Sequence, residues 1–210
     1  MCSSDLQLYV STDGGQTFTL RNTGQNFFNS SGGGGQGWYD NALWVDPTNS
    51  DNLIVGGIAI AERHVAKEDE HHRMLAKQDH GCRFFITQSV YDAGSTKSLL
   101  SDYALSLQAA GRSPVPVVLT FSPCGSVRTL EFMKWLGIAF PRWLENELRH
   151  SADTLERSVD LCERVFTDVQ DYAREKCLPI GINVESVSIR KSEIDASVEL
   201  YRRLSSHLER

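Results

Sequence analysis

Short apolar runs alternate with longer amphipathic stretches from about residue 52 to the end of the chain. Four short runs are rich in β-branched and aromatic residues, which favour strands: residues 52–60, 83–91, 115–121 and 179–187. Apolar residues recur at helical spacing over residues 68–80, 95–110, 126–136, 152–176 and 188–208, and a further helix begins at Pro141. This alternation predicts βα units around a parallel sheet.

Two of the predicted helices define most of the expected core. The stretch 152–176 carries a sustained apolar stripe made of Leu155, Val159, Cys162, Val165, Phe166, Val169 and Tyr172. The stretch 188–208 is predicted to close the fold, with an inward face made of Ile194, Val198, Tyr201 and Leu204.

The first 57 residues have a different pattern. Short alternating runs at residues 8–10 and 42–45 lie between Gly-, Ser- and Asn-rich clusters, which is typical of short antiparallel strands. Arg21 is the only Lys or Arg before Gly57, whereas charged residues are frequent afterwards. We therefore divide the chain into residues 1–6, 7–56 and 57–210.

One motif of the N-terminal part has a recognisable form. Residues 11–18 fit the pattern S-x-D-x-G-x-x-F through Ser11, Asp13, Gly15 and Phe18, and resemble the Asp-box hairpin of sialidase-like β-propellers. An Asp-box is usually a structural turn, in which short polar side chains bond to backbone amides. A propeller needs about four or more blades, so residues 7–56 are predicted to be a blade fragment.

The origin of this part is a separate question. Residues 1–6 resemble the translation of a sequencing adapter, and we interpret them as an artefact. The simplest hypothesis is a chimera joined at about residues 54–57. A sialidase-like propeller glycosidase or a carbohydrate-binding protein is the alternative function that this part suggests.

The composition of the chain argues against nucleic-acid and membrane partners. The net charge of −6, with charges of both signs interspersed, argues against nucleic-acid binding. No apolar run approaches the roughly 20 residues that span a bilayer, so we expect no membrane partner and a cytoplasmic location. The five cysteines include no CxxC pair, which predicts reduced and mostly buried thiols.

The strand expected at residues 83–91 carries the strongest family resemblance. Residues 84–92, FFITQSVYD, resemble the strand that holds the folate-contacting glutamine in methylenetetrahydrofolate reductases. Other segments resemble the same family in the same order: residues 56–64, 75–82, 136–144 and 181–186. The resemblance covers about residues 55–210. It implies an α/β fold that is a partial (βα)8 TIM barrel, strands five to eight, preceded by a small all-β propeller-blade fragment.

The resemblance also implies a function and site residues. Enzymes of this family bind FAD and transfer a hydride from NADH or NADPH to 5,10-methylenetetrahydrofolate, giving 5-methyltetrahydrofolate. By resemblance Gln88 would contact the pterin, Arg190 and Lys191 the glutamate tail, and His64 and Lys77 the flavin cofactor. The ordinary alternatives are a glutamine that satisfies a strand end, a surface histidine and solvated basic residues.

The sequence departs from the family in one important respect. The family's general acid on the first strand, and the aspartate after the fourth strand, have no counterparts here, so we expect no catalytic residues, bound flavin or reductase activity. Open strand edges would favour self-association. A third possibility is a non-enzymatic relative that binds folate or flavin. Glu70, His71 and His72 lack the H-E-x-x-H spacing, so we expect a solvated run and no metal site.

Overall fold

The computed structural model describes residues 9–10, 17, 19–20, 41–46 and 49–208, and the chain divides into two compact units, Met1–Asn41 and Ala42–Arg210. In the first unit, β1 (Tyr9–Val10) pairs with β2 (Thr19–Leu20) in antiparallel register. Most of the Asp-box motif lies outside the described residues. The propeller fragment and the interpretation of residues 1–6 therefore stay predictions.

The second unit is built on a five-stranded sheet with the order β3-β4-β5-β6-β7. Its strands are β3 (Asn41–Asp46), β4 (Asn49–Ala59), β5 (Phe84–Ser89), β6 (Val117–Phe121) and β7 (Ile180–Val184). The last four pair in parallel, each with the next along the chain. This confirms the α/β class and the four predicted β runs, whereas the identification with barrel strands five to eight stays a prediction.

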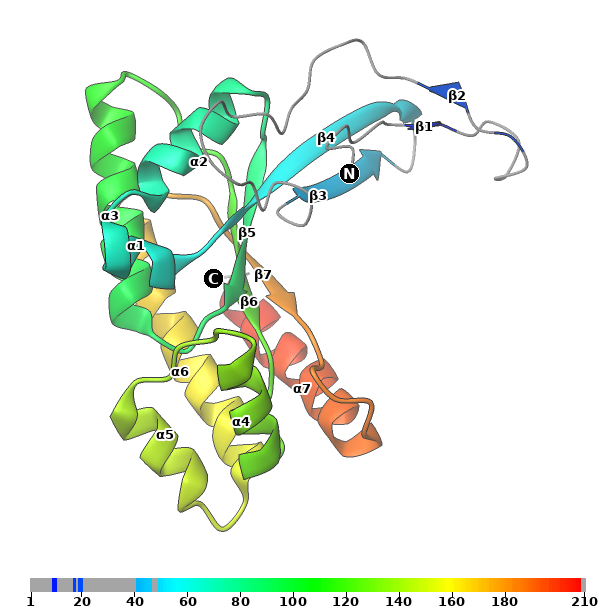
Figure 1. Cartoon of the computed structure of the whole chain (residues 1–210), viewed down its shortest axis with the longest axis vertical. Coiled ribbons are helices and arrows are strands. Elements are labelled where there is room, and N and C mark those ends of the chain that lie inside the picture. Colours follow the sequence, from blue (N-terminus) through cyan, green and yellow to red (C-terminus); the bar gives the residue numbers. More distant parts are fainter. Residues whose placement is uncertain (1–8, 11–16, 18, 21–40, 47–48, 209–210) are drawn as a thin grey trace, which may run out of the picture. The chain divides into compact units, whose positions relative to one another are not determined.

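Seven helices accompany this sheet in the described part of the chain. They are α1 (Ala61–Lys67), α2 (Glu70–Asp79), α3 (Ala93–Ala109), α4 (Val127–Trp135), α5 (Arg142–Arg149), α6 (Thr154–Glu175) and α7 (Lys191–Leu208). Contacts join α2 to α3, α3 to α6 and α6 to α7, and Figure 1 shows these helices beside the central strands. Helix α1 has no counterpart among the predicted elements.

The core lies between the sheet and this row of helices. Five positions of the predicted α6 stripe are buried: Val159, Cys162, Val165, Phe166 and Val169. The rings of Phe166 and Phe121, on α6 and β6, meet edge to face with centroids 5.8 Å apart. This aromatic contact fixes the long helix against the middle of the sheet.

The predicted orientation of α7 is wrong for three of its four residues. Ile194, Val198 and Tyr201 are 43%, 46% and 53% exposed, and of the four only Leu204 is buried. The buried stripe is instead Glu193, Ser197, Leu200 and Leu204. The helix is thus rotated by about one residue, because its contacts with β7 and α6 take the stripe that contains Leu200.

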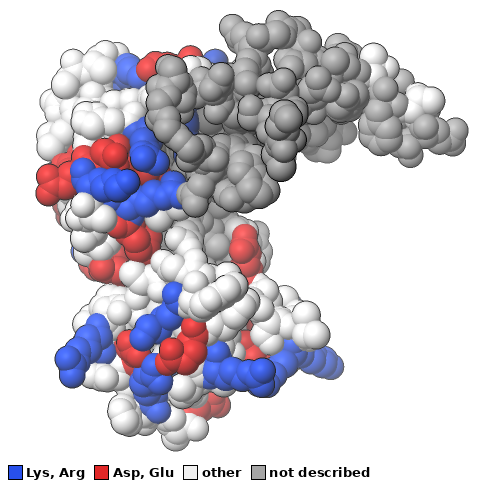
Figure 2. Space-filling model, viewed as in Figure 1, with Lys and Arg blue, Asp and Glu red and all other residues white. Residues whose placement is uncertain are grey.

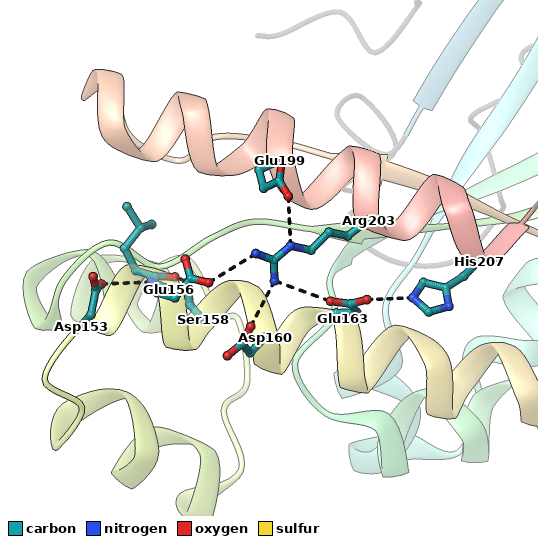
Figure 3. A network of polar contacts seen from close by, with 9 residues as sticks. Asp153, Glu156, Ser158, Asp160, Glu163, Glu199, Arg203 and His207 are labelled. Carbon is teal, nitrogen blue, oxygen red and sulfur yellow. Dashed lines mark hydrogen bonds and ion pairs between the residues drawn. The ribbon is translucent and has the colours of Figure 1, made fainter.

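A polar network joins α6 to α7 (Figure 3). The Arg203 guanidinium lies within ion-pair distance of four carboxylates: Asp160 at 3.1 Å, Glu199 at 3.2 Å, Glu156 at 3.3 Å and Glu163 at 3.7 Å. Glu163 also accepts a 2.8 Å contact from Nε2 of His207. One cation therefore holds together carboxylates from both helices.

The cysteines, the surface charges and the apolar content of the helices were the subject of sequence predictions. Cys82, Cys124 and Cys162 are buried, as predicted for most of the thiols, whereas Cys177 is exposed and Cys2 lies outside the described residues. Figure 2 shows Lys and Arg interspersed with Asp and Glu on the face that it presents. None of the helices in the described part combines the length and apolar content needed to cross a bilayer.

The boundary proposed at residues 56–57 falls inside a regular element. β4 runs without interruption from Asn49 to Ala59, and Gly56 and Gly57 pair with Phe84 and Phe85 of β5. A join within this strand would have to preserve its register with β5. The chimera and the division at this point stay predictions.

Candidate functional site at the strand ends

The carboxyl ends of β4, β5, β6 and β7 lie at one edge of the sheet, because these strands are parallel. In parallel α/β folds this edge is where loops gather functional side chains. Polar residues follow or end each strand here: Glu62 after β4, Gln88 and Asp92 at the end of β5, Ser122 after β6, and Asn183 and Glu185 around the end of β7. We define these residues, together with the loop 136–140, as the strand-end site.

Gln88 is placed by an irregularity in β5. The pairing between β5 and β6 shifts register between Ile86 and Ser89, and such a bulge redirects the side chains around it. The half-buried Gln88 side chain donates from Nε2 to the backbone oxygen of Leu136, 3.2 Å away. Gly137, with φ of +89°, follows directly, and a Cβ there would lie 4.0 Å from Nε2. Among the described residues, the amide oxygen of Gln88 has no hydrogen-bond partner.

Glu62 reaches the same loop from the neighbouring strand end. Burial raises the pKa of its carboxyl, as does the nearby charge of Asp92, while hydrogen bonds to the backbone of Glu62 itself and of Ala139 lower it. The burial effect is the largest, so the protonated form is favoured more than for a carboxyl in water. The loop 136–140 thus joins the ends of β4 and β5 through Glu62 and Gln88. The sequence resemblance includes Glu62 in the segment 56–64 but assigns it no role.

Helix α3 and the aromatic residues beside it support this loop. Asp92 caps α3 by accepting hydrogen bonds from the backbone N–H groups of Gly94, at 3.0 Å, and Ser95, at 3.2 Å. The rings of Tyr91 and Phe140 lie 4.3 Å apart between centroids. Tyr91 is fully buried and its hydroxyl donates to the backbone oxygen of Ser122. The loop therefore rests on a rigid base that links β5 to β6.

The other half of the strand-end site is lined by short polar side chains. Nδ2 of Asn183 donates to Oε1 of Glu185 at 2.8 Å and to Oγ1 of Thr120 at 3.3 Å. The hydroxyls of Ser89 and Ser122 share a buried 2.6 Å hydrogen bond. These contacts extend the polar edge from β5 to β7, and they provide both donors and acceptors to a ligand.

Arg190 and Lys191 follow the last strand, at the junction between the β7–α7 loop and α7. Both residues are exposed. The backbone N–H of Arg190 donates to Oγ of Ser188, which fixes the turn before the helix. The loop that carries these two cations starts from the same edge of the sheet as Gln88. Their predicted contact with a folate tail stays a prediction.

His64 and Lys77, the predicted cofactor contacts, lie among the first helices. His64 is 2% exposed, and its Nε2 lies 3.0 Å from Oδ2 of Asp102 on α3. Nζ of Lys77 donates to the backbone oxygen of Ile58 in β4 at 2.6 Å. His64 is therefore not a surface histidine, and Lys77 is not a fully solvated lysine, as the ordinary alternatives had it. Their predicted contact with a flavin stays a prediction.

The run Glu70-His71-His72 is not solvated, contrary to the sequence expectation. Glu70 is fully buried and His71 is 8% exposed, because α2 turns both toward α1. Oε1 of Glu70 accepts a hydrogen bond from the backbone N–H of Ile60 at 3.2 Å. Only His72 keeps the exposed position that the sequence suggested for all three.

Comparison with known proteins identifies a relative with a described ligand. A solved structure of an uncharacterised protein from Clostridium thermocellum, which binds two copies of 5-methyl-5,6,7,8-tetrahydrofolic acid, is 48% identical, with a TM-score of 0.67. The similarity covers 72% of this chain and 53% of that chain, so the present chain spans about half the length of this relative. No protein-family model and no curated protein match the chain.

Proposed function

We propose that this chain binds a reduced folate at the strand-end site, with the pterin ring hydrogen-bonded to Gln88. Two observations together support this proposal most strongly. The amide of Gln88 lies half-buried at a parallel strand end, and the chain is 48% identical to a protein that binds 5-methyltetrahydrofolate. A pterin edge presents donors and acceptors side by side, and a glutamine amide offers one of each. Its Nε2 already bonds to the loop 136–140, and its oxygen is available to a ligand N–H.

The surroundings of Gln88 support the same ligand class. Glu62 is held against the loop 136–140, and burial raises its pKa, so its carboxyl can serve as a donor when protonated and as an acceptor when ionised. Arg190 and Lys191, which follow the same sheet edge, supply positive charge suited to the carboxylates of a folate glutamate tail. The proposal thus places the pterin at β4 and β5 and the tail toward the start of α7.

The reductase activity is a further part of the proposal. It would require FAD and NADH or NADPH, and His64 and Lys77 are the residues predicted to face the flavin. In a (βα)8 barrel a flavin pocket is built from the loops of many strands, whereas the described part supplies four parallel strands. We therefore expect the chain as given to bind folate without retaining flavin, and to be inactive as a reductase.

A non-catalytic folate-binding protein is the second candidate, supported by the binding of 5-methyl-5,6,7,8-tetrahydrofolic acid to the similar protein from Clostridium thermocellum. The propeller glycosidase or carbohydrate-binding alternative depends on residues 7–56, most of which lie outside the described part. Fusing residues 57–210 to strands one to four of a related reductase, and then measuring NADH oxidation with FAD and a folate acceptor, would separate the reductase from the binding protein.

Isothermal titration of the whole chain with 5-methyltetrahydrofolate tests the proposal. Gln88→Leu keeps the side-chain volume but removes the amide, and we expect affinity to fall at least about tenfold, the equivalent of about 1.4 kcal/mol. Gln108→Leu, at an exposed position of α3, is the matched control and should bind as the unaltered chain does. Failure of the unaltered chain to bind, or equal affinity of both variants, would refute the proposal.

A further inference from the structure

Three helices bring metal-ligating side chains together away from the strand-end site. His64 on α1, His71 on α2 and Asp102 on α3 each offer a ligand atom, and these atoms all lie within 4.8 Å of one another. Nε2 of His64 and Oδ2 of Asp102 are 3.0 Å apart, and the rings of His64 and His71 meet edge to face at 5.3 Å. Asp102 thus meets His64, 38 residues earlier in the sequence, and His71 on the next helix after His64.

The burial of the two histidines is not matched by their hydrogen bonding. His64 and His71 are 2% and 8% exposed, yet within the described part of the chain the buried Nδ1 of each has no hydrogen-bond partner. A buried polar atom without a partner costs about 1–3 kcal/mol, and native proteins keep few of them. Protein groups of the described part therefore do not fully satisfy either ring, and His64 faces Asp102 through its other nitrogen, Nε2.

The chemistry of the three side chains fits a metal ion, since imidazole nitrogens and carboxylate oxygens are common ligands of zinc. Asp102, which is 43% exposed, supplies the negative charge and leaves the cluster open to an ion from solvent.

The geometry is compatible with one tetrahedral ion. Bonds of about 2.0–2.1 Å to nitrogen and oxygen place two ligand atoms of a tetrahedral zinc ion about 3.3 Å apart. The separation of 3.0 Å between His64 and Asp102 is already close to this value. Bringing the His71 ligand atom into the same shell requires a shift on the order of 1 Å.

We propose that His64, His71 and Asp102 form a binding site for a divalent transition-metal ion of the zinc class, with water in the fourth position. Two imidazoles and one carboxylate select zinc, cobalt or nickel over magnesium and calcium, which prefer oxygen ligands. The ion would tie α1 to α2 and α3. This role is distinct from the flavin contact predicted for His64, and it does not depend on folate binding.

Titration of the metal-free whole chain with Zn²⁺ alone, followed by calorimetry, tests the site. We expect one equivalent to bind, with affinity reduced at least tenfold in His71→Gln and in Asp102→Asn. His72→Gln, on the adjacent exposed residue of the same helix, and His150→Gln, on α5's C-terminal side, are matched controls and should retain zinc binding. Circular dichroism of each variant establishes that it is folded, and Asp102→Asn keeps the test valid if a histidine variant unfolds.

Cobalt provides an independent readout. Co²⁺ bound in a tetrahedral N,O site should give visible absorption that disappears in folded His71→Gln and persists in His72→Gln. The assignment is overturned if the unaltered chain binds neither ion, or if the control variants lose affinity as much as His71→Gln does. Titration of His71→Gln with 5-methyltetrahydrofolate distinguishes the two proposals, because folate binding should be unchanged when zinc binding is lost.

Discussion

The polar network around Arg203 predicts a loss of stability whose magnitude follows from the number of its ion pairs and from their exposure. Arg203→Met removes the cation but keeps most of the aliphatic length, so the change isolates the charge. It leaves four carboxylates, Glu156, Asp160, Glu163 and Glu199, close together without their shared partner (Figure 3). The free energy of unfolding should therefore decrease through lost attraction and new repulsion.

The expected loss is modest because the network is partly exposed. Arg203 is 29% exposed and its partners are between 30% and 63% exposed. Exposed pairs contribute about 0.2–1 kcal/mol each, and a network is worth more than an isolated pair. We expect a loss of about 1–2 kcal/mol, which corresponds to a decrease in melting temperature of roughly 2–8 °C for a domain of this size.

Urea denaturation followed by circular dichroism measures the effect, at low and at 1 M NaCl. Arg202→Met is the matched control, since Arg202 is 72% exposed and pairs with Glu199 at 3.9 Å. It should change stability by less than about 0.5 kcal/mol. The loss in Arg203→Met should shrink at high salt, where exposed charges are screened. Equal losses in the two variants, or a loss of Arg203→Met that does not depend on salt, would refute the reasoning.

Three further predictions concern burial. Iodoacetamide should label Cys177 in the folded chain but not Cys124, which is buried and has a pKa raised to about 11, and peptide mapping showing equal labelling would contradict this. Burial raises the pKa of Glu70, so its contribution to stability is present below pH about 4.5 and is lost as the pH rises through the folded pKa. In urea denaturation, the free energy of unfolding of Glu70→Gln relative to that of the unaltered chain should thus be higher at pH 7 than at pH 5. A difference in free energy that does not change with pH would contradict this explanation. Leu200→Ala should lose about 2–4 kcal/mol and Val198→Ala less than about 0.5, whereas similar losses would restore the α7 orientation expected from sequence.

The strands could be predicted because each is a short run of β-branched and aromatic residues between turn-forming residues. Phe84–Ser89 and Val117–Phe121 both fall inside the predicted runs. Helix α1 could not, since its seven residues are too few to show a periodic apolar face. The orientation of α7 was predicted wrongly because the more apolar stripe, which contains Ile194 and Val198, is not the one that packs against the fold. Contacts with β7 and α6, which no local pattern reveals, select the stripe that includes the buried Glu193.

The candidate site likewise has a part that the sequence could predict and a part that it could not. Gln88 could be singled out because residues 84–92 resemble the strand that holds the folate-contacting glutamine in methylenetetrahydrofolate reductases, whereas its position in the strand alone favours the ordinary alternative. The approach of the loop 136–140 to Gln88 and Glu62 is a long-range contact, and neither composition nor spacing indicates it. His71 gave a misleading local signal, because its burial depends on α1 and α3. Its neighbours His64 and Asp102 come from helices whose packing the sequence does not specify.

The position of the pterin is the most direct test of the proposed function. A crystal structure of the whole chain with 5-methyltetrahydrofolate should show the pterin ring at the carboxyl ends of β4 and β5. An N–H of the ring should donate to the amide oxygen of Gln88 at about 2.7–3.2 Å. Folate bound elsewhere on the chain, with the Gln88 amide oxygen still without a partner, would contradict the account.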